Sequence, residues 1–191
     1  MAMKDIRLLP LRQEDRSAYE ALYESAFPAS ERKELDYMLT GDKAAAYEVL
    51  AVSTPDCPVV GMVITVTHGD LTMLDYLAIS PDLRGQGLGH AVLPMVRDRV
   101  KESGGGHFFL EIETPPPACI PRDPCDNPQQ RVRRKAFYAS AGLVETGVRA
   151  FIYGNDMELL AFPEDAEAIT FAGYDALLRA TFPADMVAER I

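Results

Sequence analysis

Apolar residues recur along the chain with two different periods, and the change between them separates predicted strands from predicted helices. Positions three and four apart indicate helices, whereas alternating or β-branched runs indicate strands. In the first part of the chain we predict a strand over Ile6–Leu11, helices over Glu14–Phe27 and Glu31–Thr40, and strands over Tyr47–Ser53, Val59–Thr67 and Leu71–Ile79. Short turns join the last three strands, which predicts an antiparallel meander.

The second part of the chain alternates helices and strands around a proline-rich segment. We predict a helix from Leu88 to about Ser103, a strand over His107–Glu113, a helix over Arg131–Ala141, strands over Leu143–Tyr153 and Met157–Ala161, and a C-terminal helix over Tyr174–Thr181. One strand–helix–strand crossover implies a parallel-type connection. The predicted fold is therefore α/β (α+β), with a mixed, mostly antiparallel central sheet flanked by helices.

Three local signals refine these elements. Ser30 is a suitable N-cap for the second helix. Pro94 removes a hydrogen bond from the helix after Leu88, which predicts a kink or a later helix start. The segment from Thr114 to Gln130 contains six prolines and no periodicity, so we predict a long loop of the kind that is often functional or mobile.

Three glycines occur in the five positions from Gly85 to Gly89, directly between a predicted strand and a predicted helix. The first turn of a helix has unpaired backbone N–H groups and a partial positive charge. Glycine lets an anion approach this backbone closely, which predicts a phosphate site. A Walker loop is excluded because no Gly-Lys-Ser/Thr follows, and the glycine spacing differs from the Rossmann fingerprint. A glycine-rich turn without a ligand is the alternative.

The pattern Arg-x-x-Gly-x-Gly at Arg84, Gly87 and Gly89, with the preceding strand Leu-Asp-Tyr-Leu-Ala-Ile-Ser, resembles motif A of the GCN5-related N-acetyltransferase (GNAT) superfamily. The order of predicted elements from Ile6 to Leu160 is similar to that family as well. The resemblance implies a GNAT-like sheet whose strands splay apart after motif A, and acetyl-CoA as co-substrate without a metal. It assigns coenzyme contacts to the backbone of Leu77, Ala78 and Ile79, and to Arg84, Gly85, Gln86, Gly87, Leu88 and Gly89.

A candidate acid follows from a second resemblance. Ala136-Phe137-Tyr138, ahead of Ser140-Ala141-Gly142-Leu143, resembles GNAT motif B, in which a tyrosine donates a proton to the leaving thiolate. A phenol that titrates near pH 10 suits that role. The resemblance therefore assigns the acid to Tyr138, while a tyrosine that merely covers the core is the alternative.

Three carboxylates are candidates for the base. Strand alternation places Glu111 and Glu113 on one face of the predicted strand over His107–Glu113. A carboxylate within an otherwise apolar strand is costly unless it is used or paired. Glu111 matches the strand glutamate that serves as base in similar ribosomal-protein alanine acetyltransferases, and Asp75 and Glu113 are its competitors. Ion pairing of the glutamates with Arg133 or Arg134 is the alternative.

Composition narrows the classes of partner and compartment. The net charge is −10, from 29 acidic and 19 basic residues, which disfavours nucleic acid as a partner. No apolar run is long enough for a transmembrane helix, and the N-terminus lacks the apolar region of a signal peptide, so we expect a cytoplasmic protein that is not bound to membranes. Cys119 and Cys125 share the proline-rich loop and can approach each other, but we expect free thiols in a reducing compartment.

The basic cluster Arg131, Arg133, Arg134 and Lys135 occupies a predicted helix start, where the helix dipole favours acids. It predicts either an anion or carboxylate partner, or a solvated helix start. The proline-rich loop and Arg131, in place of an asparagine, depart from compact GNAT members.

We therefore predict a GNAT domain over 1–162 and a C-terminal helical extension over 163–191 that packs on the same domain. The predicted function is acetyl-CoA-dependent transfer of an acetyl group to a primary amine, by direct attack in a ternary complex. The acceptor would be a small-molecule amine or a peptide N-terminus, and a homodimer is compatible with the sequence. The rivals are a non-catalytic acyl-CoA binder that acts as sensor or scaffold, and a structural module.

Overall fold

The computed structural model of the 191-residue chain describes residues 5–104, 106–152, 154–183 and 189–190. Gly105 and Tyr153, which belong to a predicted break and a predicted strand, lie outside the described residues. The chain forms two compact units: Met1–Val66 with Leu74–Ser103, and Thr67–Met73 with Gly104–Ile191. No helix within the described ranges is long and apolar enough to cross a membrane.

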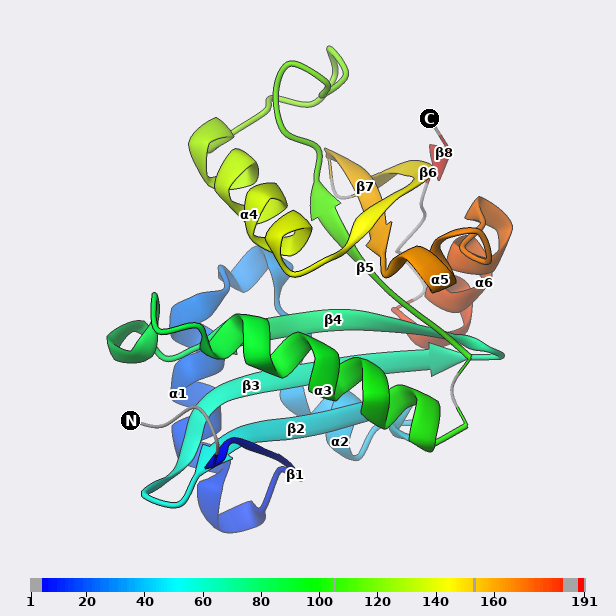
Figure 1. Cartoon of the computed structure of the whole chain (residues 1–191). Helices are drawn as coiled ribbons and strands as arrows, with labels where there is room; N and C mark the ends of the chain where they lie inside the picture. Colours follow the sequence, from blue (N-terminus) through cyan, green and yellow to red (C-terminus); the bar gives the residue numbers. More distant parts are fainter. Residues whose placement is uncertain (1–4, 105, 153, 184–188, 191) are drawn as a thin grey trace. The chain divides into compact units, whose positions relative to one another are not determined.

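The first unit contains strands whose order is β1-β2-β3-β4. Its elements are β1 (Arg7–Pro10), α1 (Arg16–Ala26), α2 (Leu35–Leu39), β2 (Tyr47–Thr54), β3 (Cys57–His68), β4 (Leu71–Ile79) and α3 (Leu88–Glu102). β1 pairs with β2 and β2 with β3, both antiparallel. Helix α3 lies across one face of these strands, and α1 and α2 lie on the other (Figure 1).

The core of the first unit forms because every second strand residue points to the same face. Ala51 of β2, Ile64 of β3 and Tyr76 of β4 belong to one buried cluster together with Tyr19 of α1 and Met38 of α2. The buried residues of α1 are Tyr19, Leu22 and Tyr23, which have the three- and four-residue spacing of one helix face. This core fixes the end of β4, from which the glycine-rich turn departs.

One local prediction in the first unit is wrong, and one of the two alternatives in another is excluded. Helix α2 begins at Leu35 with Glu34 at its N-cap, so Ser30 does not cap it; the preceding residues Ala29–Glu31 form a separate 3-10 turn. Helix α3 begins at Leu88 and continues through Pro94, which excludes a later start, and a kink at Pro94 stays a prediction. Pro94 has no N–H to donate to the carbonyl of His90. His90 is exposed and lies on an exposed side of the helix, so water can hydrogen-bond this carbonyl.

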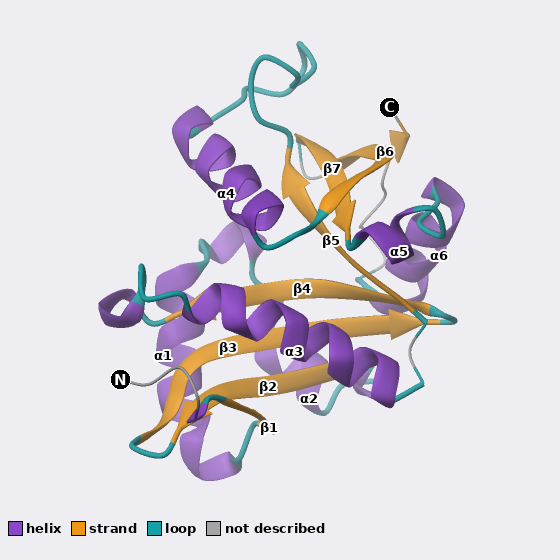
Figure 2. Cartoon of the chain, viewed as in Figure 1, coloured by secondary structure: helices purple, strands orange, loops and turns teal. Residues whose placement is uncertain are grey.

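The second unit has the strand order β5-β7-β6-β8. Its elements are β5 (His107–Glu113), α4 (Pro128–Ser140), β6 (Val144–Ile152), β7 (Asn155–Ala161), α5 (Pro163–Ala166), α6 (Phe171–Thr181) and β8 (Glu189–Arg190). The pairs β5–β7, β6–β7 and β6–β8 are antiparallel, and Figure 2 shows the long loop that joins β5 to α4. The mixed α/β fold with a mostly antiparallel sheet is therefore confirmed.

Helix α4 begins one turn earlier than predicted. Pro128 occupies its first turn, where a missing N–H costs nothing, and Asn127 at the N-cap has a φ of 52°. Arg131 is consequently placed inside the helix rather than at its start. Gly142, with a φ of 93°, follows the C-terminus of α4, where a left-handed conformation favours glycine.

Candidate functional site

The glycine-rich turn presents the N-terminus of α3. Gly87 is the N-cap residue with a φ of 81°, and no side chain caps this end of the helix. Gly85 also has a positive φ, of 73°, and a Cβ built on it would meet nothing within 4 Å. The two glycines are thus required by backbone conformation. The result is an uncapped, positively polarised helix end that fits a phosphate group.

Two side chains hold the turn in place. Arg84 Nε donates a hydrogen bond to the carbonyl of Ile79 at 3.0 Å, and Gln86 donates to the carbonyl of Asp82 at 3.4 Å. The Ser80 N–H donates to the carbonyl of Val60 on β3 at 2.9 Å. These bonds tie the turn to the ends of two strands, while Arg84 itself remains exposed to solvent.

The predicted pantetheine contacts lie at the end of β4. Ala78 is buried, and Leu77 and Ile79 are half-buried. Gly61 of β3 lies so close that a Cβ there would be 2.8 Å from the Ala78 carbonyl. The side chains of Leu77, Ala78 and Ile79 are thus at least half-buried, and contact of their backbone with a coenzyme stays a prediction.

Asp75, one of the competing bases, is held by an ion pair. Its two carboxylate oxygens accept hydrogen bonds from Lys33 Nζ at 2.9 and 2.8 Å. Burial raises the pKa of Asp75, and the charge of Lys33 opposes that shift. The Lys33 N–H donates to the hydroxyl oxygens of Tyr23 and Tyr76. Asp75 therefore anchors the segment between α1 and α2.

A cavity of about 230 Å³ lies between α1 and the segment that precedes α2. Charged groups of both signs line it, among them Glu20, Glu24, Arg32 and Glu34. Arg32 Nη1 lies 3.5 Å from the Glu24 carboxylate, and its buried Nε has no hydrogen-bond partner among the described residues. The cavity suits a charged or hydrogen-bonding ligand better than an apolar one.

Glu111 lies on β5 opposite Leu159 of β7 and is half-buried. The hydroxyl of Tyr174, on α6, donates a short hydrogen bond to Glu111 Oε2. No sequence signal pointed to this partner, because 63 residues separate the two side chains. The candidate base is therefore in contact with the C-terminal extension.

Glu113 is ion-paired, as the alternative reading of these glutamates predicted. Its carboxylate lies 2.8 Å from Arg134 Nη1 and 3.2 Å from Arg131 Nη2. Two guanidinium groups therefore neutralise the charge of Glu113, whereas Glu111 accepts a hydrogen bond from an uncharged phenol.

Tyr138 lies on α4 and is half-buried, with its ring centroid 5.0 Å from that of Phe137. Burial raises its pKa above the usual value of 10, and the charge of Arg134 opposes this. The phenol therefore keeps its proton at neutral pH.

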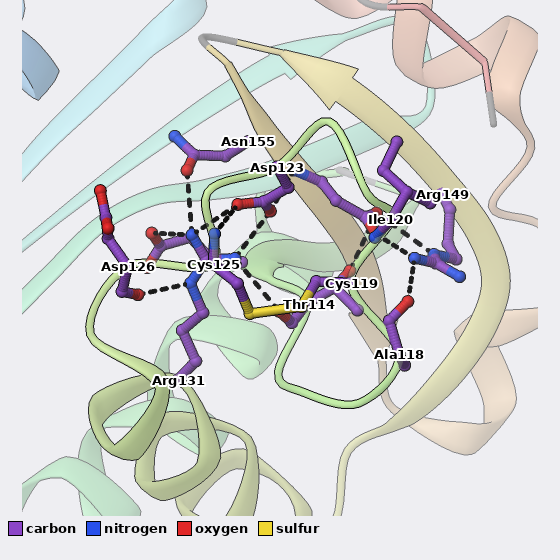
Figure 3. Close-up of a disulfide and its surroundings, with 12 residues drawn as sticks. Thr114, Ala118, Cys119, Ile120, Asp123, Cys125, Asp126, Arg131, Arg149 and Asn155 are labelled. Atoms are coloured by element: carbon purple, nitrogen blue, oxygen red, sulfur yellow. Dashed lines mark hydrogen bonds and ion pairs between the residues drawn. A yellow bond between two sulfur atoms is a disulfide. The ribbon is translucent and has the colours of Figure 1, made fainter.

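The proline-rich loop is organised by a buried ion pair. Arg131 is 0% exposed, and its guanidinium donates to both oxygens of Asp123, at 2.7 and 3.1 Å (Figure 3). It also donates to the carbonyls of Thr114 and Asp126 and to the Asn155 side chain. Burial raises the pKa of Asp123, but bonds from Arg131 and two backbone N–H groups outweigh it and lower that pKa. Arg131 of the basic cluster is therefore paired with a carboxylate of the same chain.

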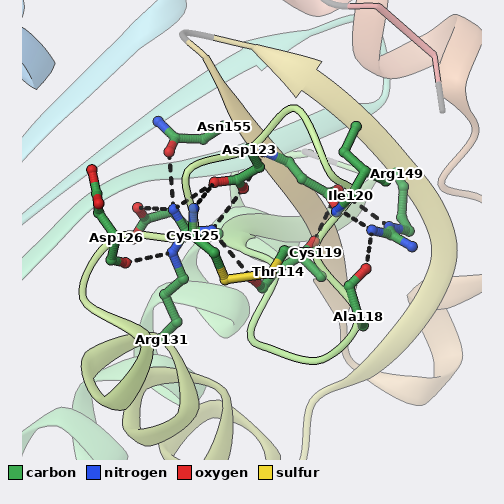
Figure 4. A network of polar contacts seen from close by, with 12 residues as sticks. Thr114, Ala118, Cys119, Ile120, Asp123, Cys125, Asp126, Arg131, Arg149 and Asn155 are labelled. Carbon is green, nitrogen blue, oxygen red and sulfur yellow. Dashed lines mark hydrogen bonds and ion pairs between the residues drawn. A yellow bond between two sulfur atoms is a disulfide. The ribbon is translucent and has the colours of Figure 1, made fainter.

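A second buried carboxylate, Asp156, holds the other side of the loop by binding Ile120 and Arg149, which Figure 4 shows. It accepts hydrogen bonds from the Thr114 hydroxyl, the Ile120 N–H and the guanidinium of Arg149. Arg149 also donates to the Ala118 carbonyl at 2.9 Å. The loop is consequently pinned to β7 and β6 at several points.

The expectation of free thiols is wrong for the two cysteines of this loop. Cys119 and Cys125 form a disulfide, with their Cα atoms 6.4 Å apart (Figure 3). The N–H of Cys125 donates to Asp123, so the same aspartate that binds Arg131 holds one end of the bridge. Cys57 remains a free thiol.

The predicted site residues fall into two groups. Leu77, Ala78, Ile79 and Arg84–Gly89 belong to the first unit, whereas Glu111 and Tyr138 belong to the second. Within the second unit, Glu111 contacts the C-terminal helix and Tyr138 lies on the helix that follows the braced loop.

The mixed α/β fold of this chain is similar to that of solved acetyltransferases. A protein of Bacteroides thetaiotaomicron ascribed to the GNAT acetyltransferases is similar over 91% of this chain and 96% of its own, with a TM-score of 0.67 and 20% identity. A spermidine N-acetyltransferase of Vibrio cholerae, solved with CoA and spermine, is similar over 85% and 98%, with a TM-score of 0.64 and 13% identity. A ribosomal-protein alanine N-acetyltransferase of Escherichia coli is similar over 87% and 99%, with a TM-score of 0.54 and 23% identity.

The family model described as "Acetyltransferase (GNAT) family" matches residues 10–120. The chain belongs to this family. The matched range includes the glycine-rich turn and Glu111, and it ends before Tyr138 and the C-terminal helices. No curated protein matches the chain in sequence.

Proposed function

We propose that this protein is an N-acetyltransferase that moves an acetyl group from acetyl-CoA to a primary amine. The observation that carries the proposal is the uncapped N-terminus of α3, where Gly85 and Gly87 adopt positive φ directly after Arg84. Such a backbone nest with an adjacent cation is suited to a pyrophosphate. Membership of the GNAT family supports an acyl-CoA as the ligand that carries this pyrophosphate.

The coenzyme would be held by two parts of the first unit. The backbone N–H groups from Gly85 to Gly89 and the charge of Arg84 would bind the pyrophosphate. Backbone groups of Leu77, Ala78 and Ile79 at the end of β4 would hold the pantetheine arm. Bound there, the coenzyme supplies an acetyl thioester to the acceptor.

The acid and base are assigned from the second unit. Glu111 would take a proton from the substrate ammonium, so that the neutral amine attacks the thioester carbonyl. As the C–S bond breaks, Tyr138 protonates the departing thiolate, and the resulting phenolate takes the second proton from the nitrogen. Asp75 and Glu113 suit the base role less well, because Lys33 and two arginines respectively neutralise them.

The acceptor is proposed to be a small-molecule amine or a peptide N-terminus. Two similar structures carry names that specify spermidine and a ribosomal-protein alanine as acceptors. The cavity beside α1, lined by carboxylates such as Glu20 and Glu24 together with cations, offers partners for a cationic or zwitterionic amine.

An acceptor screen tests the proposal. Purified protein is incubated with acetyl-CoA and polyamines, amino acids, aminoglycosides or peptide N-termini, and release of free CoA thiol is measured. We expect thiol release with at least one amine class and a thermal shift with acetyl-CoA alone. A thermal shift without transfer to any amine would favour a non-catalytic acyl-CoA binder, and no shift at all would contradict the coenzyme site.

A further inference from the structure

The C-terminal helix α6 presents a buried tyrosine to the candidate base. Tyr174 is 0% exposed, and its hydroxyl donates to Glu111 Oε2. Its ring packs edge-on against Phe109, two residues before Glu111 on β5, with centroids 6.2 Å apart. The ring and the hydroxyl of Tyr174 therefore both contact β5, at Phe109 and Glu111.

Helix α6 is positioned with little freedom. The Thr170 hydroxyl caps its N-terminus by accepting from the Gly173 N–H at 3.2 Å. A Cβ on Gly173 would lie 2.7 Å from Leu71 Cδ1, so this glycine permits close packing next to Tyr174. Leu177 and Leu178 are also buried. A helix fixed at this many points holds the Tyr174 hydroxyl in one place.

A phenol hydroxyl that donates to a carboxylate stabilises its charged form. It also restricts the rotation of the glutamate side chain, and a general base needs both the right charge and the right direction. A tyrosine whose only task was to dock α6 would not need a carboxylate partner in the middle of β5.

We propose that Tyr174 is a positioning residue that keeps Glu111 ionised and oriented to accept the proton of the substrate ammonium. The C-terminal helix, outside the range matched by the family model, is then part of the active site. The inference rests on the proposed function, because it takes Glu111 as the base.

The test compares Tyr174→Phe with wild type over a range of pH. Loss of the hydroxyl should lower kcat about tenfold without a matching change in KM for acetyl-CoA. The acidic limb of the kcat/KM profile should move to higher pH by about one unit, since the protonated glutamate is favoured. Tyr19→Phe is the matched control. It removes another buried hydroxyl, which donates to the Val63 carbonyl at 3.4 Å, and it should leave kcat and the acidic limb unchanged.

Coupling to Glu111 is tested by a double-mutant cycle. In the Glu111→Gln background, Tyr174→Phe should cause little further loss, because the two residues act as one unit. Additive losses, or an unmoved acidic limb in an active Tyr174→Phe enzyme, would overturn the positioning role and leave the proposed acetyl transfer intact.

A readout without turnover separates this inference from the proposed function. In protein labelled with ¹³C at glutamate carboxyls, the Glu111 signal is assigned by its loss in Glu111→Gln. Its titration midpoint should rise by about one pH unit in Tyr174→Phe. An unchanged midpoint contradicts the inference whether or not any amine is acetylated, whereas absence of transfer by wild type contradicts only the proposed function.

Discussion

Arg131 joins the proline-rich loop to β5 and β7. It is fully buried, and its guanidinium binds both oxygens of Asp123 while also lying 3.2 Å from Glu113. A buried charge without its partner is far more costly than the pair itself is stabilising. The loop therefore depends on this one side chain more than on any of its prolines.

Arg131→Ala should lower the free energy of unfolding by roughly 3 kcal/mol or more, because it leaves Asp123 buried without its cation. Urea denaturation measures the change. Arg133→Ala, two residues away on the exposed side of α4, is the control and should change stability by less than about 0.5 kcal/mol. Equal effects of the two substitutions would show that the buried pair does not stabilise the second unit.

Tyr138→Phe should lower kcat by about 10²-fold or more, the usual contribution of a general acid, while acetyl-CoA affinity stays near that of wild type. Its raised pKa supports the acid role, since the proton is retained at neutral pH. Single-turnover kinetics and calorimetric titration with acetyl-CoA separate the two effects. Unaltered turnover would remove Tyr138 from the acid role.

At the scale of elements, α3 offers a comparison between its two ends. Gly87 at the N-terminus and Gly104 just past the C-terminus have the same φ of 81°. A side chain at either position adopts a left-handed conformation that costs roughly 1–2 kcal/mol. Substitution of either glycine therefore carries the same cost in backbone conformation, and the two positions differ in the end of α3 that they occupy.

Gly87→Val and Gly104→Val should therefore lose similar stability, but only Gly87→Val should lose acetyl-CoA binding, by about tenfold or more. The physical reason is that a side chain beside the uncapped N–H groups blocks the approach of the pyrophosphate. Thermal shift with acetyl-CoA measures binding, and thermal melts of the free proteins measure stability. Equal affinities in the two variants would refute the phosphate site.

The loop between β5 and α4 is held by a disulfide in addition to its ion pairs. Thiol titration of the unfolded protein, purified without reductant, should find one reactive thiol, Cys57, and three after reduction. Closing a loop of this length stabilises a protein by about 2 kcal/mol, so reduction should lower the melting temperature by a few degrees. Three thiols before reduction would show that Cys119 and Cys125 are free.

At the scale of the whole molecule, the sequence predicted what is locally encoded. Glycine φ values above 50° in a turn and the alternation of side chains along β5 depend only on short segments. The turn at Gly87 and the two faces of His107–Glu113 could therefore be predicted from the sequence. The pairs Asp123–Arg131 and Glu111–Tyr174 were not, because each joins segments whose proximity is decided by tertiary packing. The disulfide was misjudged for a different reason: the sequence showed that Cys119 and Cys125 can approach each other, but the expected reducing compartment favoured free thiols.

The predicted boundary at residue 162 separates a family domain from an extension, and the packing of the extension bears on that division. Several residues after this boundary are buried, and each buried apolar side chain contributes about 1.5–3 kcal/mol. Five of them together rival the 5–15 kcal/mol net stability of a typical domain. They are Ile169, Tyr174, Leu177, Leu178 and Phe182.

A chain that ends at Phe162 should therefore fail to fold cooperatively, whereas a chain that ends at Pro183, which keeps α6, should unfold with a midpoint close to that of the full chain. Circular dichroism melts and size-exclusion chromatography of the two truncated chains measure this. If the shorter chain melted cooperatively at the same temperature, the extension would be a separate module. Helix α6 would then be available for a role other than completing the core around β5.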